Sequence, residues 1–242
     1  WVWIAGRLFG AWIVLAVVTY AQLPEQSPRV VDYAIQVRLE GTEGEAGRTL
    51  SCGEEVTWRN PADASTVELL WHVYNNAWAS RDSVWLTESR KFGDDKLPRE
   101  WGWTSIEEVR LLAVDGVRQS SPPLLPVEWV AQEGGAEDRT VMRTPLPVAI
   151  PAGGSVTVGV KFTAVLPPAF RRSGAGGEGY LHAVQWFPKL GVFEARDGET
   201  AWNCLPYHYL TEFYADYGSY RVDLTLPDAY LADGDPCGHC GL

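Results

Sequence analysis

Cysteine is scarce in this chain of 242 residues, which contains four, at positions 52, 204, 237 and 240. Four widely spaced thiols are too few to form the disulfide framework that stabilises small secreted domains. The fold must therefore be held by a hydrophobic core, and a hydrophobic content of 46%, with 12 tryptophans and 10 tyrosines, is sufficient for one. The length fits one large all-β domain or two small ones.

Recognisable catalytic motifs are also lacking. None of the histidines, His72, His182, His208 and His239, begins an H-E-x-x-H sequence, which would place two zinc-binding imidazoles on one helical face. There is no G-x-S-x-G elbow and no Cys/His pair that the sequence itself brings together, although a spatial pair remains open. We therefore assign no catalytic residue, no metal ligand and no cofactor to this chain, and we expect His72 and His208 to be structural.

The segment CGHC at residues 237–240 has the spacing of a thiol oxidoreductase or of half a zinc site. A redox pair normally opens a helix after a strand, and a structural zinc ion requires two further ligands nearby. Neither context surrounds Cys237 and Cys240. We interpret the pair as incidental and keep a thiol oxidoreductase only as a less favoured hypothesis.

Basic residues are outnumbered, with 20 Lys and Arg against 31 Asp and Glu, and the net charge is −11. Nucleic-acid binding depends on clustered basic side chains that neutralise phosphates, so this balance argues against a nucleic-acid partner. The glycine-rich segment RRSGAGGEG at residues 171–179 has neither a following helical pattern nor a G-K-S/T ending. It predicts a flexible surface loop rather than a phosphate site.

The longest apolar run, LFGAWIVLAVVTYA at residues 8–21, follows Arg7 and ends with the small residues Thr19 and Ala21. This order is typical of a secretory signal peptide. If residues 1–6 are included, the run reaches the length of about 20 residues that a membrane span requires. We therefore expect residues 1–21 to be a signal peptide or a membrane anchor, with residues 22–242 exported to the periplasm, to the extracellular space or to the outer face of a membrane.

Long helical periodicity is absent, and strict alternation of apolar and polar residues replaces it. Alternation in the segments 33–40, 155–162 and 220–226 predicts strands with these inward side chains: Tyr33, Ile35, Val37 and Leu39; Val156, Val158, Val160 and Phe162; Tyr220, Val222, Leu224 and Leu226. Turn residues such as Asp115-Gly116 separate such runs. Only residues 98–110 resemble a short helix. The pattern predicts an antiparallel β-sandwich or a saddle-shaped variant of one.

Several segments of the sequence resemble a known protein family. The run AVQWFPKLGVFE, followed by AWNCLPYHYLTEFYADYGSYRVDLTLPDAY, resembles the N-terminal domain of bacterial zinc metallopeptidases of the membrane alanyl aminopeptidase family, and VELLWHVYNNAW and TWRNPA are similar to earlier strands of that domain. The resemblance covers roughly residues 30–233 and is most specific in residues 180–227.

The resemblance implies a non-catalytic β domain that packs on a thermolysin-like catalytic domain, which supplies zinc, H-E-x-x-H and a G-x-M-E-N strand. Because this chain contains none of these motifs, it is expected to be inactive alone, with its own catalytic domain and a peptide substrate as partners. By its place in the motif, Gln185 corresponds to a glutamine that reaches the substrate N-terminus. Phe187 stands where classical members place a second Gln or Glu.

A second hypothesis is a self-standing extracellular β-sandwich that binds protein or carbohydrate through exposed tryptophans. The two hypotheses differ in their surfaces. A domain that packs on a catalytic partner should leave apolar surface uncovered when isolated, and we expect the aromatic-rich stretch 180–214 to form part of that surface.

Overall fold

A computed structural model describes residues 28–131, 138–176 and 180–230. The expected leader at residues 1–21 and the Cys237–Cys240 pair lie outside these ranges. Within them, no helix combines the length and the apolar character that crossing a membrane requires.

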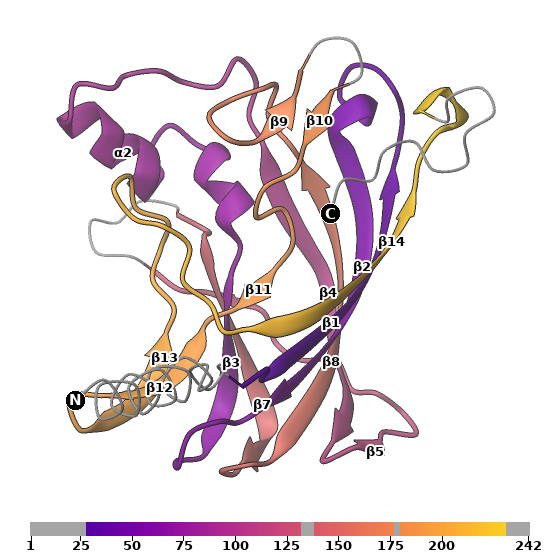
Figure 1. Cartoon of the computed structure of the whole chain (residues 1–242), viewed down its shortest axis with the longest axis vertical. Coiled ribbons are helices and arrows are strands. Elements are labelled where there is room, and N and C mark those ends of the chain that lie inside the picture. Colours follow the sequence, from indigo (N-terminus) through magenta and orange to yellow (C-terminus); the bar gives the residue numbers. More distant parts are fainter. Residues whose placement is uncertain (1–27, 132–137, 177–179, 231–242) are drawn as a thin grey trace, which may run out of the picture.

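The chain is mostly β, which confirms the predicted fold class. The larger of its two main sheets curls across the molecule (Figure 1) in the order β14-β1-β2-β8-β4-β5. Neighbouring strands are antiparallel except that β14 runs parallel to β1. The strands are β1 (Val31–Leu39), β2 (Thr49–Arg59), β4 (Trp103–Val114), β5 (Val117–Arg118), β8 (Ser155–Val165) and β14 (Gly218–Thr225).

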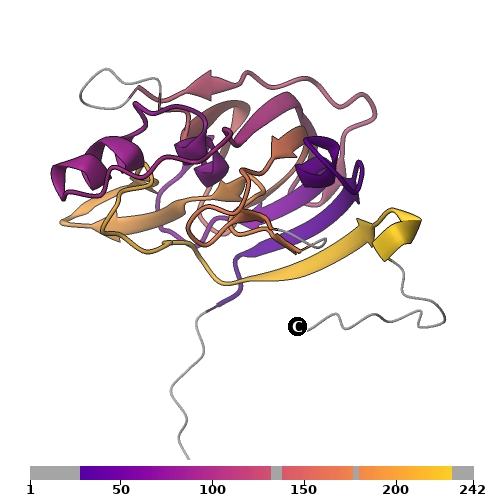
Figure 2. The ribbon, with the colours of Figure 1, turned by 90° about the horizontal axis from the view of Figure 1, so that it is seen from above.

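The second main sheet has the order β11-β3-β7-β6, formed by β3 (Thr66–His72), β6 (Glu128–Trp129), β7 (Val141–Ile150) and β11 (Lys189–Leu190). Two small hairpins are added: β9 (Gly174–Ala175) with β10 (Leu181–His182), and β12 (Val192–Arg196) with β13 (Glu199–Asn203). The helical elements are the α-helix α2 (Val84–Lys91) and the 3₁₀ turns η1 (Ala46–Arg48), η2 (Tyr74–Trp78) and η3 (Asp228–Tyr230). Figure 2 shows α2 at one end of the molecule and β14 along one side.

A single large core fills the space between the two main sheets. The side chains predicted to point inward from residues 33–39 and 156–162 are all buried, which confirms the alternation in these two strands. Trp58, Trp71 and Phe162 are among the largest fully buried side chains. Because burying an aromatic or aliphatic side chain of this size contributes about 1.5–3 kcal/mol, the core can stabilise the fold without disulfides.

The helix suggested by residues 98–110 is absent, because most of that segment belongs to β4. Two β-bulges interrupt the register of β4 against β8, between Ile106 and Glu108 and between Leu111 and Ala113. The extra residue at the first bulge moves the buried positions from 104 to 109, 111 and 113, so the period-2 alternation changes phase within the strand. The α-helix lies earlier, at residues 84–91, where the Ser83 hydroxyl accepts a hydrogen bond from the Leu86 amide as an N-cap.

Of the side chains predicted to point inward from residues 220–226, Leu226 is partly buried against the core, whereas Tyr220, Val222 and Leu224 are not buried. These side chains lie on the same sheet face as Tyr33, Ile35 and Val37 of β1, which are buried. They remain 48%, 49% and 54% exposed, because β14 is an edge strand and described rings contact only its Tyr220. Alternation shows which side chains share a face, and it does not show whether that face is covered.

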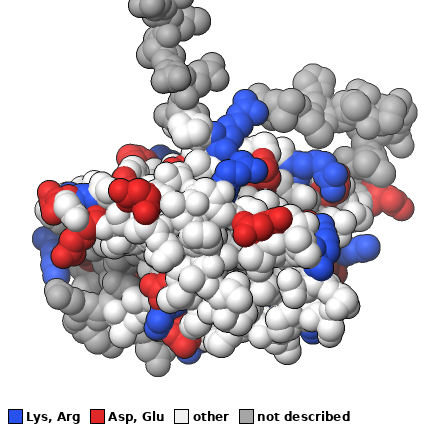
Figure 3. Space-filling model, turned by 90° about the horizontal axis from the view of Figure 1, so that it is seen from below, with Lys and Arg blue, Asp and Glu red and all other residues white. Residues whose placement is uncertain are grey.

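Charged side chains are dispersed on the face seen in Figure 3. Among the described residues visible there, Lys and Arg alternate with Asp and Glu and do not gather into a continuous basic surface. Such mixed charge is typical of a solvated protein surface.

Candidate functional site

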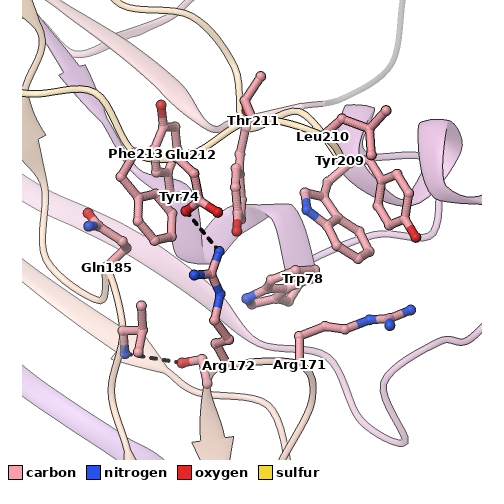
Figure 4. Close-up of a pocket in the computed structure, with 14 residues that line it drawn as sticks. Tyr74, Trp78, Arg171, Arg172, Gln185, Tyr209, Leu210, Thr211, Glu212 and Phe213 are labelled. Atoms are coloured by element: carbon pink, nitrogen blue, oxygen red, sulfur yellow. Dashed lines mark hydrogen bonds and ion pairs between the residues drawn. The ribbon is translucent and has the colours of Figure 1, made fainter.

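A pocket of about 430 Å³ lies between η2, α2, the turn at residues 171–173, the bend at residues 184–185 and segment 207–213 (Figure 4). We call it the aromatic pocket, because six aromatic side chains line it: Tyr74, Trp78, Trp85, Tyr207, Tyr209 and Phe213. Its volume is in the range that small-molecule or side-chain sites occupy.

The floor of the aromatic pocket is a small hydrophobic cluster separate from the main core. Trp78 meets Trp85 edge to face with ring centroids 4.9 Å apart, and Tyr74 stacks on Tyr207, also at 4.9 Å. All four rings are buried. Edge-to-face and offset-stacked rings hold one another in fixed orientations, so the floor is a rigid apolar surface.

The outer wall, segment 204–217, has little regular secondary structure and is anchored by side chains. Glu88 on α2 accepts a hydrogen bond from the Tyr209 amide at 3.0 Å, and its other oxygen lies 2.9 Å from His208 Nδ1. Partial burial opposes ionisation of Glu88, but the contacts with His208 and Tyr209 outweigh it and lower its pKa. His208 thus helps to fasten segment 204–217 to α2.

Two consecutive arginines differ in role. Arg171 forms an ion pair with Asp94 at 2.5 Å, and its guanidinium lies 5.1 Å from the ring centre of Trp85. The Arg171 hydrogen bond lowers the pKa of Asp94. Arg172 points into the pocket toward Glu212, 3.1 Å away, and both side chains of this pair are largely exposed, at 60% and 77%. Arg171 is thus part of the wall, whereas Arg172 presents an accessible charge.

Backbone strain is concentrated at this pocket. In the described ranges, four residues other than glycine have positive φ: Asp115, Arg171, Gln185 and Asp197. The two aspartates precede Gly116 and Gly198 in hairpin turns, where Asp-Gly is favoured. Arg171 (φ 56°) and Gln185 (φ 52°) are not favoured in this conformation, which costs about 1–2 kcal/mol per residue. Both line the aromatic pocket, and strain of this kind clusters at functional sites.

Hydrogen bonds connect the two strained residues through Ser173. Phe170 and Ser173 exchange backbone hydrogen bonds of 2.9 and 3.1 Å across the two-residue turn that contains Arg171. The Ser173 hydroxyl donates to the His182 carbonyl and accepts from the Val184 amide, so the turn is fastened to the bend at Gln185. The segment predicted to be a flexible loop therefore supplies one wall of the pocket.

Gln185 lies at the margin of the aromatic pocket. Its side chain is half-buried, and its amide group is turned away from Arg172 in Figure 4. Among the described residues its side chain has no hydrogen-bond partner.

Replacing Gln185 tests the strain directly. We expect Gln185→Gly to be more stable than Gln185→Ala by about 1 kcal/mol, because only glycine adopts positive φ without a penalty. The matched control is the exposed β10 residue His182, whose φ is not positive, where glycine should be less stable than alanine by about 0.5–1 kcal/mol. Urea unfolding of the four variants measures both differences, and equal stability of the two Gln185 variants would contradict a strained backbone.

The fold also creates a Cys/His pair that the sequence did not predict. Cys204 Sγ lies 3.5 Å from His72 Nδ1, although 132 positions separate the residues, and both side chains are buried. Burial, and secondarily Lys189, lowers the pKa of His72 to about 4, and burial raises the pKa of Cys204 well above its usual range. Both groups are therefore neutral near pH 7, so the pair lacks the thiolate that nucleophilic catalysis requires. In the described ranges, no three His, Cys, Asp or Glu side chains are placed to hold a metal ion.

Comparison with known proteins gives a limited result. No family model matches the chain, and no curated protein matches it. Similar solved structures include an M1 zinc metallopeptidase mutant from Deinococcus radiodurans (12% identity, TM-score 0.29, 60% of this chain and 23% of that one). Two others are a two-domain M1 zinc metallopeptidase mutant bound to L-arginine (12%, 0.36, 86% and 35%) and a Deinococcus radiodurans mutant bound to a Tyr-Ser-Ala substrate (12%, 0.33, 86% and 35%).

The chain thus spans about a third or less of the length of these structures.

Proposed function

We propose that this chain is the non-catalytic β domain of an exported zinc aminopeptidase-like metallopeptidase. In this function it packs on a catalytic domain and contributes the aromatic pocket to the substrate cleft. The observation that carries the proposal is Gln185, which belongs to the family-like segment VQWFPK and has a strained backbone at the margin of a pocket lined with aromatic rings.

The chemistry of Gln185 fits the recognition of a peptide N-terminus. A neutral amide accepts a hydrogen bond from an ammonium group through its carbonyl oxygen and donates through its nitrogen to a peptide oxygen. Since the Gln185 side chain is not committed to a partner among the described residues, both groups are available to a ligand. The adjoining apolar floor suits the side chain of a substrate residue.

Exposed apolar residues in the outer wall of the pocket support a packing partner. Leu205, Leu210 and Tyr217 lie in segment 204–217 with more than half of their surface exposed, and Leu210 lines the aromatic pocket. Exposed apolar side chains that lie close together are typical of an interface. We infer that a catalytic domain covers segment 204–217.

The self-standing binding module remains the second candidate, because one other pocket has suitable chemistry. It measures about 560 Å³ and is lined by Trp103, Trp129 and Arg139, with the guanidinium 5.9 Å from the Trp129 ring centre. Exposed indole rings are suited to stacking on sugar or aromatic groups. Glycan binding without any effect of Gln185 on peptide hydrolysis would favour this candidate.

Substituting Gln185 in the complete gene product tests the proposal. Loss of one hydrogen bond to a charged group costs about 1.5–3 kcal/mol, so Gln185→Ala should lower kcat/KM about 10–100-fold for peptides with a free N-terminus. N-acetylated peptides should lose little. The control is Gln36→Ala on the exposed outer face of β1, which should leave both rates unchanged.

Two results would contradict the proposal. Equal losses on free and acetylated peptides would show that Gln185 does not contact the N-terminus. Stoichiometric zinc together with aminopeptidase turnover in the 242-residue chain alone would show that the domain is itself catalytic. Metal analysis after dialysis and an aminoacyl reporter assay measure the second.

A further inference from the structure

The outer edge of β14 differs from the other edges of the two main sheets. Where the structure describes them, those edges are β5, β6 and β11, and each is only two residues long. β14 is eight residues long and, within the described part of the chain, pairs only with β1, as Figures 1 and 2 show. No described strand pairs with the backbone N–H and C=O groups on its other side.

β14 lacks most of the features that keep edge strands from pairing. Its sequence, GSYRVDLT, contains no proline and no lysine, and its two charges, Arg221 and Asp223, are opposite in sign and lie 3.6 Å apart. Its register against β1 is continuous, without a bulge. Natural proteins usually protect long edges with lysines, prolines or bulges, so an edge of this length without them is suited to accept another strand.

The strand is complementary to itself when it is reversed. If two copies pair antiparallel about Val222, Arg221 of each lies opposite Asp223 of the other, and Ser219 lies opposite Thr225. On the other face, Tyr220 lies opposite Leu224, and the two Val222 residues meet. Opposite charges and apolar pairs directly across an antiparallel ladder stabilise it, whereas a register shifted by two residues toward either end would lose the charge pairing.

We propose that a second copy of this chain pairs with β14 in this antiparallel register, which joins the two six-stranded sheets into one continuous sheet across a two-fold axis. Such an interface is isologous, because each copy contributes the same residues. It extends the core-facing side of the sheet and covers the half-exposed row of Tyr220, Val222 and Leu224. The inference does not depend on the proposed function, since none of the residues involved lines the aromatic pocket.

Charge reversal tests the register in the full chain. Sedimentation velocity over a range of concentrations should show a monomer–dimer equilibrium. Arg221→Asp or Asp223→Arg alone would place like charges opposite each other and should weaken dimerisation at least tenfold. The double variant restores opposite charges and should recover it. Both side chains are exposed, so the variants should keep the wild-type melting temperature.

Cysteine cross-linking tests the same register in a background with Cys237→Ser and Cys240→Ser. Val222→Cys should form a disulfide-linked dimer, because directly opposed residues lie within disulfide reach. Tyr220→Cys and Leu224→Cys should each fail to cross-link alone and should cross-link when the two proteins are mixed. Val117→Cys on the exposed strand β5 is the negative control.

Any of three outcomes would overturn the proposal. The first is a wild-type chain that stays monomeric at all concentrations. The second is a dimer that responds equally to the single and double charge variants. The third is efficient self-cross-linking through Tyr220→Cys without cross-linking through Val222→Cys, which would assign the edge to another register or another occupant.

Discussion

We expect Glu54→Gln to raise the free energy of unfolding at pH 8 and to flatten its decline between pH 5 and pH 8. Glu54 lies on the core-facing side of β2, and its buried oxygens accept no hydrogen bond from the described residues. Burial raises the pKa of this carboxyl well above its usual value. The folded protein therefore keeps a proton that the unfolded chain releases above about pH 4.3.

The sign of the pH dependence follows from that proton. Where the folded state binds more protons than the unfolded state, stability falls as pH rises, by up to about 1.4 kcal/mol per pH unit, until the folded pKa is reached. Glutamine has a similar shape and does not ionise, so the part of the slope that comes from Glu54 should disappear. Urea unfolding from pH 5 to pH 8 measures it.

The neighbouring residue provides the control. Glu55 points to the opposite face of β2 and forms an exposed ion pair with Arg118 at 2.6 Å. Glu55→Gln should change stability by less than about 1 kcal/mol and should leave the pH slope intact. If the wild type and Glu54→Gln lose stability in parallel above pH 5, Glu54 is ionised in the folded state and our interpretation is wrong.

A loss of about 1–3 kcal/mol is expected for Arg48→Met, because a buried carbonyl loses its donor. The Arg48 guanidinium is only 5% exposed, and it donates to the Leu166 and Trp101 carbonyls at 2.7 and 3.1 Å. It also pairs with Glu100. Methionine fills a similar volume but leaves the buried Leu166 carbonyl without this donor, so the cost includes an unsatisfied polar group.

Two further variants define the cause of that loss. Arg118→Met removes an arginine of the exposed pair with Glu55 and should cost less than about 1 kcal/mol. Arg48→Lys keeps the charge but cannot reach several acceptors at once, so its stability should lie between those of the wild type and Arg48→Met. Denaturant midpoints measure all three, and a cost below 1 kcal/mol for Arg48→Met would show that the guanidinium contributes little.

The strands could be predicted from sequence where one residue in two faces a covered side, as in β1 and β8. Alternation did not predict β4, because β-bulges at Ile106 and Leu111 shift it. It also overestimated the burial of Tyr220, Val222 and Leu224, because burial depends on elements that the local sequence does not encode. Alternation is a property of one strand, whereas coverage is a property of its neighbours.

The candidate site could be predicted only at Gln185, through its place in a recognisable motif. Arg171 and Arg172 lie in a glycine-rich segment whose composition is typical of a loop, and nothing in that composition indicates a tight turn at a pocket. The contact between His72 and Cys204 joins residues 132 positions apart, so local periodicity contains no trace of it. Long-range contacts of this kind arise only when the sheets assemble.

The parallel pairing of β1 with β14 has a consequence for how the chain folds. It joins the first and last strands of the described region, and the hydrogen bond between Ser219 and Asp32 spans 187 positions. Closing a loop of that size has a large entropic cost that is recovered only when the rest of the sheet is in place. During synthesis β1 therefore cannot pair with β14 until nearly the whole domain has been made. The six-stranded sheet is completed at the end of folding.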